Sequence, residues 1–234
     1  MLDEYRKAFY FDGVCSKDLG LYISGDKTYN SPEKKYDKVS IPGRSGDLLL
    51  SDGSYKNFKV SYDSFVVYNL DHKIRDLRSF LLSKDGYRRL EDDYHPHEFK
   101  MAAFSGPLNF DVILLTAGKV TLEFDCKPQR YLKQGELPID VTSNRVIFNP
   151  TYCTAKPLIT VTGTGSFTIG GRTVTVTESG ITIDTDIEQA YNGSTYKNDK
   201  ITVTNNLFPV LEPGENEITL SGVTLSITPR WYTL

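Results

Sequence analysis

Ile41-Pro42-Gly43-Arg44-Ser45-Gly46-Asp47 and Pro213-Gly214-Glu215-Asn216-Glu217-Ile218 are two glycine turns, and each leads into a segment with strand character. Neither stretch contains a nucleophile, a set of metal ligands or a phosphate-binding loop. Turns built on glycine and proline direct the backbone from one strand to the next. The two stretches therefore indicate a β-rich protein whose product is a surface rather than a reaction.

The C-terminal part of the chain has the composition of a sheet. Residues 150–234 hold 18 of the 22 threonines, and threonine alternates with apolar residues in Leu158–Gly163. Threonine and valine suit the pleated, half-buried surface of a strand. About seven segments of this kind, separated by glycine turns, predict a β-sandwich. Gly170-Gly171 lies between two alternating runs and predicts a tight hairpin.

The N-terminal part is charge-balanced and mixed in structure. Residues 1–149 carry 22 Lys+Arg and 22 Asp+Glu. Lys119–Cys126 alternates as a strand, with its apolar residues on one face. One helix is predicted over residues 71–84 from an apolar stripe at helical spacing, made by Leu70, Ile74, Leu77, Phe80 and Leu81. Asn69 or Asp71 is expected to cap its start, and Gly86 to end it.

The change in composition predicts two domains. Tyr131–Pro138 contains turn formers and no clear period, so we place the linker there and expect domains over residues 1–135 and 136–234. Asp26–Lys38 is polar, contains a proline and is expected to form a long loop or arm. The resulting fold class is mostly β, with two β-sandwich domains and one α-helix in the first.

Bulk properties exclude several classes of function. The net charge of −3 and a pI near 5.7 argue against nucleic-acid binding, for which a basic domain is expected. Cys15, Cys126 and Cys153 are odd in number and widely spaced, which predicts free thiols and a reducing place of folding. The N-terminus does not resemble a signal peptide, and the longest apolar runs are too short to cross a membrane.

No catalytic, metal-binding or cofactor-binding motif is evident, so we expect no enzyme activity and no cofactor. Asp93, His95 and His97 would share one face of a strand, but Pro96 interrupts them, and a charged loop between two strands is the simpler interpretation. Tyr191 and Tyr196 flank a polar Asn-Gly-Ser-Thr loop. Exposed aromatic residues on such a loop can stack on sugar rings, which makes these two tyrosines a candidate saccharide site.

The motifs taken together, in order along nearly the whole chain, resemble the distal tail proteins of long non-contractile-tailed bacteriophages. Ile41–Gly46 is similar to the family's Pro-Gly-Arg-Asp-Gly turn, with Ser45 in place of the usual Asp, and Phe80 replaces a common Trp. The segments that carry the resemblance are Phe9–Val14, Leu19–Ile23, Ile41–Gly46, Leu77–Leu90, Asp92–Ala102, Val120–Pro128, Asn149-Pro150, Pro157–Gly163, Ile183-Asp184, Pro213–Ile218 and Pro229-Arg230.

The resemblance implies a structural protein of the virion. It implies a ring-forming N-terminal β-sandwich with a helix and an extended hairpin, and a galectin-like C-terminal sandwich. Six copies would form a homohexameric ring at the tail tip or baseplate hub, assembled in the cytoplasm of the bacterial host. Expected partners are other copies of the chain, the tail tube protein, a tail-tip or tail-associated protein and a receptor-binding protein, with DNA only passing through the channel and no membrane contact.

Two further expectations concern sites. The turn with Ile41, Gly43, Arg44 and Gly46 is a candidate subunit interface, because a glycine turn lies beside a polar arm that has no core to join. The alternative function is a carbohydrate-binding β-sandwich that recognises cell-wall saccharides through Tyr191 and Tyr196.

Overall fold

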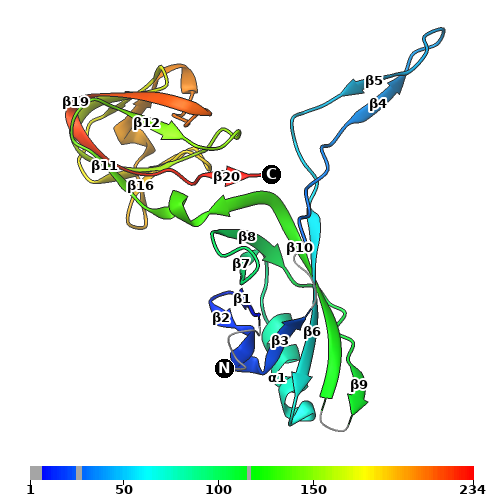
Figure 1. Ribbon diagram of the computed structural model, residues 1–234. Helices are drawn as coiled ribbons and strands as arrows, with labels where there is room; N and C mark the ends of the chain where they lie inside the picture. The colour runs from blue at the N-terminus through cyan, green and yellow to red at the C-terminus, as the bar shows by residue number, and fades with distance from the viewer. Residues whose placement is uncertain (1–6, 25–27, 115–116) are drawn as a thin grey trace. The chain divides into compact units, whose positions relative to one another are not determined.

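The computed structural model describes residues 7–24, 28–114 and 117–234, and the chain forms two compact units, Met1–Arg130 and Tyr131–Thr233 (Figure 1). Strands dominate both units, which confirms the mostly-β fold class. Each unit has its own cluster of buried apolar side chains.

The first unit is built on an antiparallel sheet with the strand order β2-β1-β7-β8-β10-β6-β3, and β9 also pairs with β10. The strands are β1 Phe9–Phe11, β2 Val14–Cys15, β3 Leu21–Ser24, β6 Phe58–Val67, β7 Arg88–Asp92, β8 Glu98–Ala103, β9 Asp111–Leu114 and β10 Ala117–Leu132, with a short 3-10 helix, η1, at Ser16–Leu19. β10 and β6 pair over ten residues each, from Ala117 opposite Val67 to Cys126 opposite Phe58.

Aromatic rings fill the core of this unit. Phe124 on β10 contacts the rings of Phe9, Phe11, Tyr62 and Phe104, with centroid distances between 5.2 and 5.9 Å. The predicted alternation of β10 is confirmed, since Val120, Leu122, Phe124 and Cys126 are all buried. Burial raises the pKa of the Cys126 thiol to about 12, so this thiol stays protonated and inert.

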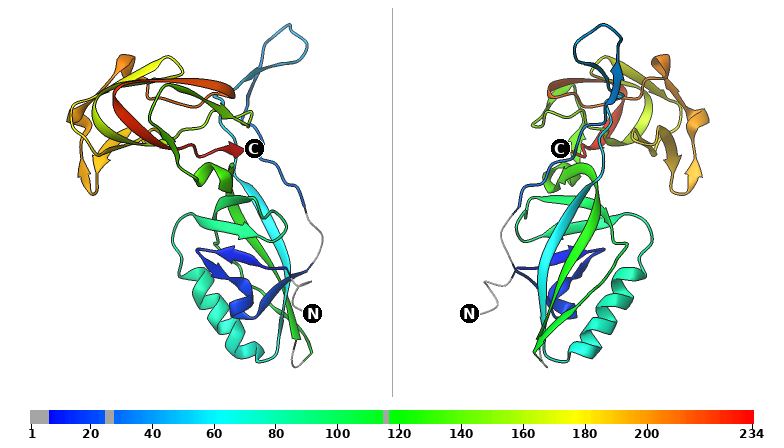
Figure 2. Two further views of the ribbon diagram at one scale, coloured as in Figure 1. Left: turned by 60° about the vertical axis from the view of Figure 1, so that its left-hand side comes forward. Right: turned by 90° about the vertical axis from the view of Figure 1, so that its right-hand side faces the viewer.

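The helix α1, Leu70–Leu82, lies beside the strands of the first unit (Figure 2). Its buried residues Leu70, Leu77 and Leu81 belong to the same core. The helix ends at Leu82, two residues before the predicted end at Lys84. Ser83 follows it, and its hydroxyl donates to the Phe80 carbonyl at 2.9 Å. Gly86 therefore lies beyond the helix end. Asn69 occupies the N-cap position, but its side chain makes no capping hydrogen bond. No helix within the described residues has the length and hydropathy to cross a bilayer.

Two strands of the first unit form a sheet of their own, β4 Asp37–Ser40 paired with β5 Asp47–Leu50. The ladder continues below them, since the Lys35 amide donates to Ser54 and the Lys56 amide donates to Glu33. We call residues 33–56 the arm. The predicted arm at Asp26–Lys38 overlaps the first six residues of this arm and includes the segment that leads into it; residues 26 and 27 lie outside the described residues.

The second unit is arranged around the long pair β13 and β19, which a bulge between Gly163 and Ser166 divides in two. One end of the pair is flanked by β12, β14 and β18, and the other end by β11, β15, β16 and β17. The strands are β11 Ile139–Val141, β12 Arg145–Asn149, β13 Leu158–Ile169, β14 Arg172–Val176, β15 Ile181–Asp184, β16 Gln189–Asn192, β17 Thr195–Tyr196, β18 Ile201–Val203, β19 Gly214–Thr228 and β20 Tyr232–Thr233; short 3-10 helices are η2 Lys133–Glu136, η3 Asn198–Lys200 and η4 Thr204–Asn206. Both ends contribute to one core, which is the arrangement of a β-sandwich.

Two sequence motifs of this unit have clear local causes. Gly170 and Gly171 take φ values of +54° and +78° between paired Ile169 and Arg172, which confirms the predicted two-residue hairpin. Asn216 in the Pro-Gly-Glu-Asn turn is buried. Its amide donates to the Glu212 and Gly214 carbonyls and its oxygen accepts from the Glu212 amide, so it holds the turn that starts β19.

The first residues after Arg130 belong to the second unit, five residues earlier than the expected boundary at 135/136. The Leu132 amide donates to the Trp231 carbonyl, and the Arg230 amide donates to the Gly135 carbonyl, both at 2.8 Å. The Arg230 guanidinium also holds Asp184 with two hydrogen bonds of 2.7 and 3.0 Å. Burial alone would raise the pKa of Asp184, but Arg230 outweighs it and leaves that pKa below its usual range.

Candidate functional site

The four residues predicted as a subunit interface lie together at the tip of the arm. Ile41, Gly43, Arg44 and Gly46 form the turn between β4 and β5, which the Arg44 amide closes by donating to the Ile41 carbonyl at 3.1 Å. Gly43 and Gly46 have φ values of +79° and +86°, a region that glycine occupies without strain. The side chain of Arg44 is exposed. The turn therefore presents a single cation at the end of a two-stranded ladder.

The arm exposes aliphatic side chains on both of its faces. Val39 lies opposite Leu48 and Asp37 opposite Leu50, so Val39, Leu48 and Leu50 share one face. These three residues are 41%, 40% and 51% exposed, and Leu49 on the other face is 52% exposed. A two-stranded hairpin alone is marginally stable in water. Its exposed apolar face is the kind of surface that a partner covers.

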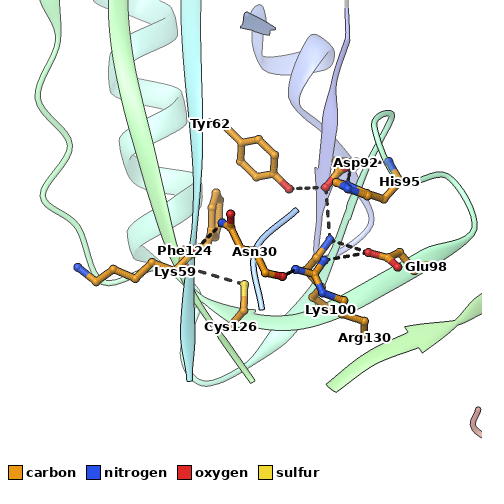
Figure 3. Close-up of polar contacts among 10 residues, drawn as sticks. All are labelled: Asn30, Lys59, Tyr62, Asp92, His95, Glu98, Lys100, Phe124, Cys126 and Arg130. Carbon is orange, nitrogen blue, oxygen red and sulfur yellow. Dashed lines mark hydrogen bonds and ion pairs between the residues drawn. The ribbon is translucent and has the colours of Figure 1, made fainter. Parts of the chain in front are cut away.

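A group of charged side chains lies inside the first unit, and the sequence analysis did not predict it. We call Tyr62, Asp92, His95, Glu98, Lys100 and Arg130 the buried ion cluster (Figure 3). Lys100 and Asp92 side chains are each 2% exposed, and the Lys100 Nζ lies 3.5 Å from both Asp92 Oδ2 and Glu98 Oε1. The Tyr62 hydroxyl donates to Asp92 Oδ2 at 2.7 Å. Four strands, β6, β7, β8 and β10, thus supply one network.

The electrostatics of the cluster favour a charged Asp92. Burial alone would raise the pKa of Asp92, but the Lys100 cation and hydrogen bonds from Tyr62 and His95 outweigh it and leave that pKa below its usual value. Burial, and then the neighbouring Asp92 charge, raise the pKa of the Tyr62 phenol well above its usual value. The cluster therefore holds ionised Asp92 and neutral Tyr62 at neutral pH.

The histidine pair interpreted as a loop lies between β7 and β8, as expected. His95 contacts Asp92 twice. The His95 backbone amide donates to Asp92 Oδ1 at 2.7 Å, and the same oxygen lies 3.0 Å from His95 Nδ1. Its other ring nitrogen, Nε2, is buried without a hydrogen-bond partner. No group of three or more His, Cys, Asp or Glu that could hold a metal ion occurs within the described ranges.

The cluster also contacts the segments that enter and leave the arm, residues 28–32 and 57–59, which we call the root of the arm. The Arg130 guanidinium donates from Nη1 to Glu98 at 3.0 Å and from Nη2 to the Asn30 carbonyl. Its Cζ lies 4.9 Å from the centre of the Phe58 ring. The Asn30 side chain in turn donates to the Lys59 carbonyl at 2.9 Å.

One signal for the cluster was present in the sequence. Lys100 and Ala102 are two residues apart on β8, so their side chains lie on the same face of the strand, and Ala102 belongs to the core. A lysine at an inward position needs a buried anion. Which anion it meets depends on the pairing of β8 with β7 and β10, and that pairing is not written in any local pattern.

Tyr191 and Tyr196, the candidate saccharide site, are direct cross-strand neighbours on β16 and β17. Residues directly opposite each other in an antiparallel pair share one face, so the two rings lie on the same side of this hairpin. Tyr196 is 70% exposed, and Tyr191 is half-buried. β17 is the last strand in its sheet, so the pair is at a sheet edge.

Comparison with known proteins gives a match in structure. No protein-family model matches the chain, and no curated protein does. Seven chains of solved structures are similar to it. One is the Dit protein (gp 19.1) of SPP1, described as a paradigm of the hub adsorption apparatus in phages that infect Gram-positive bacteria. The TM-score is 0.77 at 16% sequence identity, over 97% of this chain and 99% of the SPP1 chain. The chain therefore has the fold of Dit along nearly its whole length.

Proposed function

We propose that this protein is a distal tail protein, a structural hub of a phage tail tip with no catalytic role. The observation that carries the proposal is the agreement of fold with SPP1 Dit over 97% of this chain and 99% of the other. Coverage on this scale includes both units and the arm, so the likeness is not that of one common β-sandwich. The ordered motifs in the sequence support the same conclusion independently.

The proposed assembly is a homohexameric ring that connects the tail tube to the tip and to host-recognition proteins. A contact between unlike surfaces of neighbouring copies produces a ring when the rotation between copies closes. The arm is a suitable part of such a contact, because it exposes Val39, Leu48 and Leu50 on one face and Arg44 at its tip. We propose that a neighbouring copy covers this face.

The location and the partners follow from the hub role. The protein would be part of the virion, after assembly in the cytoplasm of the host. It would contact the tail tube protein, a tail-tip or tail-associated protein and a receptor-binding protein, while DNA passes through the channel.

The first test is the mass of the protein in solution together with negative-stain images. A hexamer would weigh roughly 160 kDa, six times 26.4 kDa. Leu48→Lys with Leu50→Lys is expected to shift the mass toward the monomer, because it places charge in the covered face. Leu82→Lys on α1 is the matched control, since Leu82 is 50% exposed and Leu50 is 51% exposed. A wild-type monomer at all concentrations contradicts the ring, and an intact hexamer in the double variant removes the arm from the interface.

The pairing of Tyr191 with Tyr196 favours a second candidate function, binding of cell-wall saccharides by the second unit. Two aromatic rings on one face of an edge hairpin can form a stacking platform. Binding to a glycan array that is lost in both Tyr191→Ala and Tyr196→Ala would support this candidate. Tyr152→Ala is the control, because Tyr152 is 99% exposed and does not belong to this hairpin. Absence of glycan binding by the wild type would exclude it.

A further inference from the structure

Polar contacts join the two sides of the root of the arm, and Phe58 on the returning side belongs to the buried apolar core. Asn30 donates to the Lys59 carbonyl and so ties the outgoing segment to the returning one. Tyr29 places its ring edge on His95, at a centroid distance of 5.3 Å. Small changes at the root of a long ladder move its far end by many times more. The side chains at the root are therefore the ones that determine where the arm points.

Arg130 of the buried ion cluster contacts both sides of the root. Its Nη2 donates to the Asn30 carbonyl on the outgoing side, and its guanidinium lies over the Phe58 ring on the returning side. The planar guanidinium suits this double role, because it donates in its plane and stacks through its face. A lysine has neither property. Figure 3 shows Arg130 between Asn30 and Glu98.

The other charged residues of the cluster hold Arg130 in place through Glu98. Glu98 accepts from Arg130 Nη1 at 3.0 Å and shares the Lys100 cation with Asp92. Burying such charges contributes little net stability compared with an apolar core of the same size. In some proteins such charges instead favour one arrangement over others, since another arrangement leaves a charge unpaired.

Arg130 is also the last residue of the first unit before the chain enters the second. We propose that Arg130 is the positioning residue of the arm, and that the buried ion cluster fixes the direction of the arm through it. This inference does not require the ring, because all of its contacts lie within one chain.

A pair of spin labels can measure the direction of the arm. One label is attached through Ser40→Cys on β4 and the other through Ser61→Cys on β6, both exposed positions. Ser40 pairs with Asp47, and the chain from Asp47 to Ser61 limits the separation of the two Cα atoms to roughly 55 Å, within range of pulsed dipolar spectroscopy. Cys15 and Cys153 are changed to serine. Labelled chains are diluted into a tenfold excess of unlabelled chains, so that distances within one chain dominate.

The expected result is a single narrow distance distribution in the wild type. Arg130→Met keeps an apolar stem but removes the contacts to Asn30 and Glu98, and we expect it to widen the distribution at least twofold. Arg130→Lys is expected to narrow the distribution little relative to Arg130→Met, because lysine keeps the positive charge but lacks the planar, forked guanidinium. Arg89→Met on β7 is the matched control, since it removes a similar Arg–Glu pair with Glu91 and a similar Arg–Phe contact with Phe99 on β8.

Several outcomes would overturn the inference. An unchanged width and mean in folded Arg130→Met would do so, as would equal widening in Arg89→Met or full recovery in Arg130→Lys. If Arg130→Met does not fold, Glu98→Gln decides instead, because it leaves Arg130 in place without its anion. Widening in Glu98→Gln supports the inference, and no widening refutes it. The mass measurement above tests the ring separately, so failure of the ring leaves this result readable.

Discussion

Replacement of Lys100 by methionine is expected to destabilise the first unit by about 3 kcal/mol. Removing one partner of a buried ion pair costs about 3–5 kcal/mol, because it leaves an uncompensated charge away from water. Lys100 and Asp92 are each 2% exposed, so this case applies. A loss at the lower end of this range is expected, because both carboxylates keep hydrogen-bond donors in the variant. Asp92 still accepts from the Tyr62 hydroxyl and the His95 amide, and Glu98 still accepts from Arg130.

Urea unfolding with two probes can isolate this effect. Trp231 is the one tryptophan of the chain and is buried in the second unit, so its fluorescence follows that unit alone. Circular dichroism follows both units. With an m-value of about 1.5 kcal/mol/M, a loss of about 3 kcal/mol lowers the midpoint of the first unit by about 2 M urea. The tryptophan transition should not move.

Two further variants make the reasoning refutable. Lys59→Met removes a lysine–glutamate pair with Glu123 on the exposed face, where side chains are 69% and 49% exposed, and no measurable shift is expected. Asp92→Asn with Lys100→Met leaves no unpaired charge at this pair and should recover much of the lost stability. The reasoning is wrong if Lys100→Met shifts the midpoint no more than Lys59→Met. It is also wrong if the double variant loses the sum of the two single effects.

Two other predictions concern acid and packing. The folded-state pKa values of Asp92 and Asp184 are lowered. The stability that each carboxylate contributes is therefore complete above the usual aspartate pKa of about 3.9 and is lost as pH falls through the lower folded value. Asp92→Asn and Asp184→Asn should each weaken the dependence of the urea midpoint on pH in their own unit, measured from pH 6 to pH 3. Gly135→Ala should cost about 1–3 kcal/mol in the tryptophan transition, because a Cβ there would lie 2.4 Å from the Trp231 backbone nitrogen. Gly118→Ala in the first unit, where the nearest atoms lie at 3.5 Å, is the control and is followed by circular dichroism; an equal loss in both variants would contradict the steric explanation.

The sequence was informative wherever a signal was local. The alternation in Lys119–Cys126, the stripe of α1 and the Gly170-Gly171 hairpin were predicted from patterns a few residues long, and the structure confirms them. The predicted end of α1 at Lys84 lies two residues beyond the observed end at Leu82. The buried ion cluster was missed because its members come together only when four strands, β6, β7, β8 and β10, assemble into one sheet. Whether the arm tip forms an interface stays a prediction.

The first unit has charged side chains that are buried and aliphatic side chains that are exposed, and both lie at or beside the arm. In the buried ion cluster, which contacts the root of the arm, Lys100, Asp92 and Arg130 are charged and buried; on the arm itself, Leu48 and Leu50 are aliphatic and exposed. Each departure costs free energy in an isolated chain. Both become favourable if the arm must be held in one direction and then be covered by another copy. A rigid root lowers the entropy lost when the arm is bound, and an apolar face supplies the free energy gained. The two features are therefore better explained together than apart, since a firmly held arm with a polar face would bind nothing, and an apolar arm without a fixed root would bind weakly.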